Sequence, residues 1–152
     1  MSVKHTLLTA LLLAPLVMLH AEEKPLSAWQ HLVRTETWTE KWPDASGKVE
    51  MRKVTAEVWT QAMQAALDAQ GTLHIPAQAK PYYLDGPLVL KSGQKLSADP
   101  TAEIRLKPGS NTCMVRNEHI VGFADQPVPE DTKPDTHITI EGGIWTTLAN
   151  GE

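Results

Sequence analysis

The chain has 152 residues and a formal net charge of −4, from 14 basic and 18 acidic residues. An acidic balance without a run of lysine or arginine argues against nucleic acid or an anionic membrane surface as a partner. The single cysteine, Cys113, excludes an internal disulfide framework. With 11 prolines and 9 glycines, the chain is expected to form one modest domain built from many short elements.

The first 21 residues have the pattern of a secretory signal peptide. Lys4 gives a basic start, an apolar run extends from Leu7 to Leu19, and Ala21 precedes two glutamates. The run is shorter than a membrane span and contains Pro15. We therefore predict export to the periplasm or the extracellular space, with residues 1–21 removed and no membrane association afterwards.

Two segments follow before the pattern becomes strand-like. Residues 22–54 are polar and irregular, which predicts an N-terminal arm with a short helix over Ala28 to Arg34. An amphipathic helix is then expected from Thr55, a candidate N-cap, to Gly71. Its apolar residues recur at three- and four-residue steps, so they form one stripe that must pack on a core. The stripe consists of Trp59, Ala62, Met63, Ala66 and Leu67.

After Gly71, short apolar runs alternate with turn-forming residues, which predicts strands of three to five residues. The loops between them are too short for crossover helices, which argues against an ordinary α/β sheet. The predicted strands are Thr72–Ile75, Tyr82–Leu84, Leu88–Leu90, Lys95–Ala98, Glu103–Leu106, Cys113–Val115 and Ile138–Ile140.

Three pairs of apolar residues in successive strands recur at intervals of 22 to 24 residues. Such a repeat predicts a solenoid with three strands in each coil. The next repeat resumes only at His137, after a loop rich in proline and acid, so two coils are complete and a third has begun. The pairs are Leu73 and Leu96, Leu84 and Leu106, and Leu90 and Met114.

The helix and three segments after it, residues 72–76, 83–93 and 138–145, resemble the opening of right-handed parallel β-helix proteins. The most similar group is the pectin-active one, which includes pectate-lyase-like proteins and polygalacturonase-type glycoside hydrolases of family 28. The resemblance extends over about residues 55–145. It implies an all-β solenoid of about two to three coils in residues 55–152, in which the α-helix caps the N-terminal end and the coils are incomplete.

The resemblance implies carbohydrate chemistry, but the catalytic motifs of family 28 are missing. Those enzymes carry Asn-Thr-Asp, Asp-Asp and Gly-His-Gly segments, followed by Arg-Ile-Lys. In this chain, residues 111–113 read Asn-Thr-Cys, with cysteine in place of the acid, and the Arg-Leu-Lys of residues 105–107 comes too early. We therefore assign no catalytic, cofactor-binding or metal-binding residue here, and we expect no cofactor.

Two interpretations of function follow. The chain is either the N-terminal portion of a secreted pectin-type glycosidase or lyase, with its catalytic coils beyond residue 152, or a non-catalytic β-helix module that binds a surface or a carbohydrate. In both, the partner is a polysaccharide, with acidic pectin-like polymers as one option. The sequence leaves open which sugar is bound, whether cleavage is hydrolytic or eliminative, and whether calcium takes part.

The other chemistry-bearing residues have ordinary explanations beside functional ones. The acids Asp125, Glu130, Asp131 and Asp135 form either a solvated loop or the lining of a groove or Ca²⁺ site. Cys113 is expected to be a small buried residue. The histidines lack metal-ligand spacing, which favours surface or turn roles, and the tryptophans either pack or stack on sugars. These residues are His31, His74, His119 and His137, and Trp29, Trp38, Trp42 and Trp145.

Overall fold

The computed structural model describes residues 23–43, 46–119 and 133–147. The predicted signal peptide lies outside these ranges, as do three of the four clustered acids. The elements are the 3-10 helix η1 (Leu26–Leu32), the helix α1 (Thr60–Gln70), and the strands β1 (Arg34–Pro43), β2 (Val49–Val58), β3 (Thr72–Ile75), β4 (Tyr82–Leu84), β5 (Leu88–Leu90), β6 (Lys95–Leu106), β7 (Val115–Asn117) and β8 (Thr139–Thr147).

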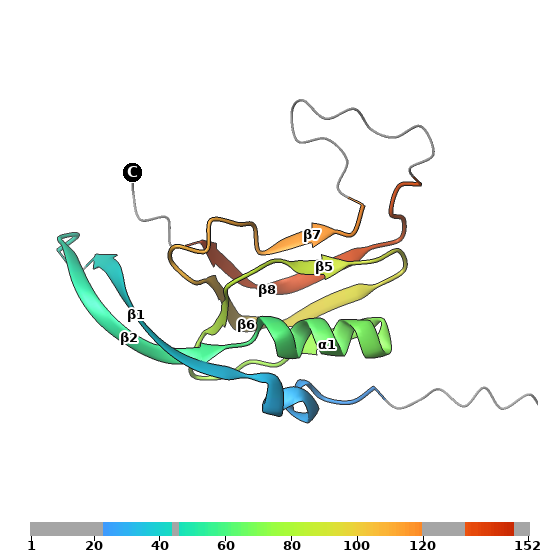
Figure 1. Ribbon diagram of the computed structural model, residues 1–152, viewed down its shortest axis with the longest axis horizontal. Coiled ribbons are helices and arrows are strands. Elements are labelled where there is room, and N and C mark those ends of the chain that lie inside the picture. The colour runs from blue at the N-terminus through green and yellow to red at the C-terminus, as the bar shows by residue number, and fades with distance from the viewer. Residues whose placement is uncertain (1–22, 44–45, 120–132, 148–152) are drawn as a thin grey trace, which may run out of the picture.

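The described strands form two sheets (Figure 1). The main sheet has six strands in the order β1-β2-β4-β6-β3, and β8 also pairs with β6. Strands β1 and β2 are antiparallel, whereas the other pairs in this sheet are parallel. The second sheet contains only β5 and β7, which run parallel. The architecture is therefore a mixed sheet with a small companion sheet and two helices.

This architecture corrects the predicted right-handed parallel β-helix. A solenoid of repeated coils was expected, but the main sheet mixes parallel strands with an antiparallel hairpin. The repeat did identify strand neighbours, because Leu73 pairs with Leu96 as its interval implies. The third interval was wrong, because Leu90 pairs with Asn117 and not with Met114. A regular interval thus reports which strands lie side by side, and it does not define the complete fold.

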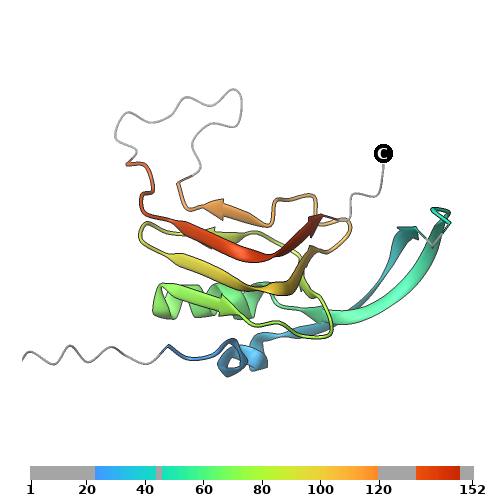
Figure 2. The same cartoon turned by 180° about the vertical axis from the view of Figure 1, so that it is seen from behind.

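The arm that was expected to be irregular instead forms a long hairpin of β1 and β2, paired from Arg34 with Val58 to Pro43 with Val49. It curves away from the rest of the molecule (Figures 1 and 2). Alternation along β1 places the tryptophans, the glutamates and Arg34 on one side, and the threonines and Lys41 on the other. Threonine and tryptophan favour strands, which explains the hairpin despite its polarity. The short helix before it is η1, which begins two residues earlier than predicted.

The amphipathic helix is confirmed, but its start was wrong. Helix α1 begins after Trp59, and the candidate N-cap Thr55 lies in β2 instead. The end was predicted correctly: Gly71 has φ 74°, and its N–H donates to the Leu67 carbonyl at 2.9 Å. This left-handed conformation favours glycine. All five residues of the predicted stripe are buried.

The core lies between α1 and the sheets. Figure 1 shows α1 in front of β6 and β8, and Figure 2 shows the same strands in front of α1. The buried faces of the short strands contribute branched apolar side chains, which pack against the helix. No helix among the described residues is long and apolar enough to span a membrane. The core residues from the strands include Leu73, Ile75, Leu84, Leu88, Leu90, Leu96 and Ile104.

Strands β6 and β8 are longer than predicted, because residues typical of turns lie inside these strands instead of ending them. The expected strands Lys95–Ala98 and Glu103–Leu106 join into β6, and the register with β8 shifts between Ala98 and Glu103. Gly142 of β8 lies beside this irregularity with φ 74°, where an added Cβ would be 2.0 Å from the Ala98 carbonyl oxygen. The Gly142-Gly143 pair therefore bends the strand where it passes close to β6.

Candidate functional site

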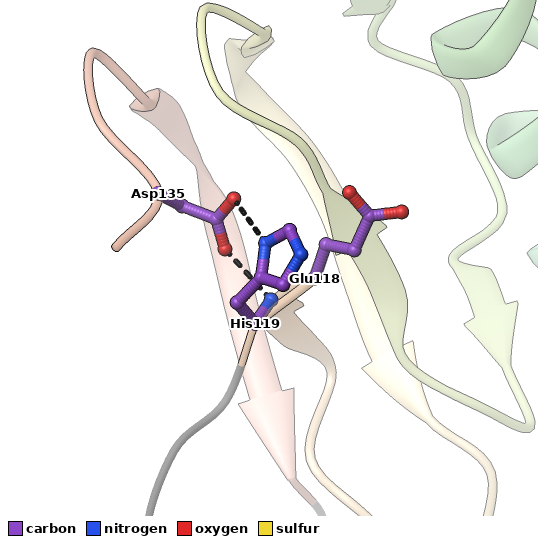
Figure 3. A group of neighbouring side chains, drawn as sticks. All are labelled: Glu118, His119 and Asp135. Atoms are coloured by element: carbon purple, nitrogen blue, oxygen red, sulfur yellow. Dashed lines mark hydrogen bonds and ion pairs between the residues drawn. The ribbon is translucent and has the colours of Figure 1, made fainter. Parts of the chain in front are cut away.

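The first candidate site is formed by Glu118, His119 and Asp135 (Figure 3). Glu118 and His119 directly follow β7, whereas Asp135 precedes β8. Figure 3 shows Asp135 facing one nitrogen of the imidazole and Glu118 on the other side of the ring. One potential ligand atom from each side chain lies within 4.8 Å of the other two. Two chain segments thus bring a histidine and two carboxylates together.

Asp135 is the fixed member of this cluster. Its Oδ2 accepts hydrogen bonds from the His119 backbone N–H at 2.8 Å and from Asn117 Nδ2 at 3.1 Å. Its Oδ1 lies 3.0 Å from His119 Nδ1 and accepts a bond from Ser92 Oγ at 3.3 Å. Only 2% of the side chain is exposed. These bonds hold the carboxylate in one orientation, facing the imidazole.

The charges of His119 and Asp135 stabilise each other. Hydrogen bonds from the side chain and backbone of His119 lower the pKa of Asp135 to about 2. The same carboxylate raises the pKa of His119 through a hydrogen bond and charge attraction. An ionised Asp135 therefore directs the Nδ1 proton of His119 toward itself and leaves Nε2 facing outward. The imidazole is half-exposed and accessible to a ligand.

This geometry limits the chemistry of the cluster. Glycoside hydrolysis uses two carboxyl groups that both reach the scissile bond. Asp135 is buried and already accepts several hydrogen bonds, so it is not available to act on a sugar. It is a positioning residue for His119. The groups that remain free to meet a ligand are the imidazole Nε2 and the Glu118 carboxylate, which can accept a proton or bind a cation.

The second candidate site is a surface that we call the hairpin face. It consists of alternate residues of β1 and their neighbours on β2, on β4, on β6 and directly after β6, so aromatic rings and charged groups lie together. The ring centroids of Trp38 and Tyr83 are 4.8 Å apart in an edge-on arrangement. The residues of the hairpin face are Arg34, Glu36, Trp38, Glu40, Trp42, Arg52, Tyr83, Arg105 and Lys107.

Guanidinium groups surround the ring of Trp42 on this face. The Cζ of Arg52 lies 3.6 Å from the ring centroid, and that of Arg105 lies 4.8 Å from it. Arg52 also donates from Nε to Glu40 Oε1 at 2.7 Å, and its Nη2 lies 2.6 Å from the same oxygen. The Glu40 side chain is completely buried and accepts a further bond from Trp38 Nε1 at 3.1 Å. Ion pairs and ring contacts thus hold the face in a defined arrangement.

Asp85 joins the hairpin to the start of α1. Its carboxylate accepts hydrogen bonds from Arg34 Nη2 and Thr60 Oγ1, each at 2.6 Å. Partial burial alone would raise the pKa of Asp85, but the hydrogen bonds from Thr60 and Arg34 outweigh this effect and hold the pKa below its ordinary value of 3.8. The ionised form is therefore favoured in the folded protein, and it contributes to stability.

We expect the Asp85→Asn variant to be less stable than the parent by about 1 kcal/mol at pH 7, because two charge-assisted hydrogen bonds are weakened. The contribution of an acid with a lowered pKa is present above pH 3.8 and is lost as the pH falls through the lower folded value. The difference in unfolding free energy between parent and variant should therefore become smaller in acid. Urea unfolding at pH 7 and pH 3, followed by circular dichroism, measures both effects.

The matched control is Asp68→Asn. Asp68 also has a lowered pKa, mainly through its hydrogen bond from Lys91, but this pair is nearly half exposed. Exposed ion pairs contribute little, so the control should change stability by less than about 0.5 kcal/mol. Equal effects of the two substitutions would contradict a special role for Asp85 at the junction.

The structure also places the residues singled out in the sequence. Cys113 is exposed, so its predicted burial was wrong. His74 points outward as predicted, with Nδ1 3.1 Å from Ser97 Oγ and Nε2 3.2 Å from Asp99 Oδ1. Trp145 is partly buried against the core, as expected. Asn111 has φ 47°, a left-handed conformation that asparagine tolerates better than most residues.

From the sequence, Asp135 was expected in an acidic loop and His119 on the surface, and the contact between them was not predicted. The two residues are 16 positions apart, and no short motif joins them. Asn117, at the end of β7, was the one available signal, because a short polar side chain there can fix a neighbouring loop. The hairpin face was missed for another reason: its charged residues suggested a solvated arm.

Searches against protein-family models, curated proteins and solved structures return no significant match for this chain. The likeness to pectin-active proteins therefore rests on the sequence segments alone.

Proposed function

We propose that this chain is a non-catalytic carbohydrate-binding module and that the hairpin face binds an acidic polysaccharide. The observation that carries the proposal is the close alternation of indole rings and guanidinium groups around Trp42. Indole rings offer a flat apolar surface to the C–H groups of sugar rings, and guanidinium groups donate paired hydrogen bonds to carboxylates. A polymer of uronic acids presents both chemical groups along its length.

Donors remain available on this face although its cations are paired. Arg52 uses Nε and Nη2 for Glu40, but a guanidinium group carries five N–H donors, and 41% of this side chain is exposed. Arg34, on the same side of β1, is 46% exposed beside Glu36 and Asp85. These two arginines can bind sugar carboxylates, while the half-buried Trp38 and Trp42 contribute apolar surface beside them.

The carboxylates of the hairpin face favour binding over catalysis. Glu40 is buried against Arg52, and Glu36 forms ion pairs with Arg34 and Lys107. A glycosidase needs one carboxylic acid to donate a proton and a second carboxylate to attack or to activate water. Both glutamates are engaged by cations of the same face, so they suit a rigid binding surface. The predicted export of the chain would bring that surface to extracellular polysaccharide.

The test is isothermal titration calorimetry of the chain with polygalacturonate and with the uncharged polymer dextran. We expect polygalacturonate to bind, dextran to bind at least tenfold more weakly, and added salt to weaken the acidic polymer's binding. Trp42→Ala should weaken polygalacturonate binding by tenfold or more. Thr39→Ala is the matched control, because Thr39 is exposed on the opposite side of the same strand and should leave binding unchanged.

Two results would contradict the proposal. If neither polymer binds, or if Thr39→Ala weakens binding as much as Trp42→Ala does, the hairpin face is not the binding surface. If the chain releases reducing ends or unsaturated products from polygalacturonate, the non-catalytic assignment is wrong.

A further inference from the structure

We propose that His119 and Glu118 bind a divalent transition-metal ion such as Zn²⁺, with Asp135 orienting His119, at a site separate from the hairpin face. Their potential ligand atoms lie within 4.8 Å of one another. Zinc binds imidazole nitrogen and carboxylate oxygen at about 2.0 to 2.2 Å, so two ligand atoms on one ion lie at most about 4.4 Å apart, which is less than 4.8 Å. The exposed side chain of Glu118 can close the difference by small rotations, because it is not packed in the core, while Asp135 keeps the His119 ring in place.

The roles of the three side chains follow from their orientations. Nδ1 of His119 faces Asp135 Oδ1 at 3.0 Å, which leaves Nε2 as the nitrogen that meets the ion. Histidine ligands typically bond their second nitrogen to a carboxylate in this way, which fixes the ring and strengthens the ligand. Glu118 lies on the opposite side of the ring from Asp135 (Figure 3) and supplies a carboxylate ligand. Asp135 acts as the positioning residue and adds negative charge.

The frame behind the site is already formed. Asp135 is fixed by Asn117, by the backbone of His119 and by Ser92. Ser92 in turn accepts a hydrogen bond from the Thr136 N–H at 3.1 Å, and Gly93 N–H donates to the Thr136 carbonyl at 2.9 Å. These bonds join the β5–β6 connection to the segment before β8. A site whose orienting residue is held by such a network binds its ion with little reorganisation.

A second histidine provides an internal comparison. His74 has the same exposure as His119, 52%, and its Nε2 lies 3.2 Å from Asp99 Oδ1. However, 41% of the Asp99 side chain is exposed, against 2% for Asp135. Among the described residues, the group that combines three potential ligands within 4.8 Å is the one at His119. His74 is therefore a matched control.

The experiment is calorimetric titration of the full chain, free of affinity tags, with ZnCl₂, together with elemental analysis of the dialysed protein. We expect one zinc ion per chain, with no competition from CaCl₂, because calcium takes oxygen ligands. His119→Ala should abolish stoichiometric binding, and Asp135→Asn should weaken it by about 10- to 100-fold, as found for residues that orient metal ligands. His74→Ala should bind like the parent. Circular dichroism establishes that each variant is folded.

Three results would overturn the site: no saturable zinc binding by the parent, equal losses in His119→Ala and His74→Ala, or unchanged affinity in Glu118→Gln. The last variant matters because Glu118 is exposed and its substitution does not disturb the fold. Polysaccharide binding is measured separately, so either proposal can fail without the other.

Discussion

Replacing Met63 by aspartate is expected to destabilise the chain by more than about 4 kcal/mol. Met63 is fully buried in the first turn of α1, in the cluster formed with Leu67, Leu73 and Leu96. Loss of the methionine alone costs about 2 to 5 kcal/mol through the cavity it leaves. A carboxylate at this place additionally loses its hydration without gaining a partner. Urea unfolding followed by circular dichroism gives the difference in unfolding free energy.

Gln61→Asp provides the control for this prediction. Gln61 is exposed on the same helix, two residues away, so the same new side chain stays hydrated there. Its effect should be less than about 0.5 kcal/mol, as for ordinary surface substitutions. A small effect of Met63→Asp would mean that α1 can move off the sheets, and it would contradict the packing of the apolar stripe against the core.

The local elements were predictable because they depend on neighbouring residues. The apolar stripe of α1 follows from a 3.6-residue period, and its end follows from the left-handed conformation of Gly71. Three strands, β3, β4 and β5, have the predicted bounds. The start of α1 was wrong because Thr55, a good cap by its own preference, pairs with Thr37 in the hairpin. Pairing with a neighbouring strand thus overrode a local capping preference.

The fold class was not predictable from the same patterns. Intervals of 22 and 23 residues identify parallel neighbours, as β6 pairs with both β3 and β4. They contain no information about β1 and β2, which convert the sheet into a mixed one. The hairpin was missed because the hairpin face is built from ion pairs and indole rings. The usual alternation of apolar and polar residues is therefore absent from β1 and β2.

The candidate sites depend on contacts between distant residues, which sequence spacing does not report. Asp135 reaches Ser92 across 43 positions, and Lys107 reaches Glu36 across 71. Neither contact belongs to a motif. The composition drew attention to tryptophans and acids, but which of them meet is decided by the hairpin and by the segment before β8.

The buried carboxylate of Glu40 leads to the second large effect. Arg52→Met is expected to cost about 3 kcal/mol, because removing one partner of a buried pair leaves an uncompensated charge. Methionine keeps an apolar stem over Glu40, so water does not simply replace the guanidinium group. Glu40 would then keep its hydrogen bond from Trp38 Nε1 and lose both contacts with Arg52. Urea unfolding gives the stability, and near-ultraviolet circular dichroism reports the packing of Trp38 and Trp42.

The double variant Glu40→Leu/Arg52→Met separates the charge from the packing. Replacing both members of a buried ion pair by apolar residues is often neutral or stabilising, so most of the stability lost in Arg52→Met should return. Lys48→Met is the control on the same hairpin, because the Lys48–Glu50 pair is exposed and should contribute less than about 0.5 kcal/mol. If Arg52→Met and Lys48→Met have equal effects, Glu40 is hydrated when its partner is removed. The ion pair then does not fix the hairpin face.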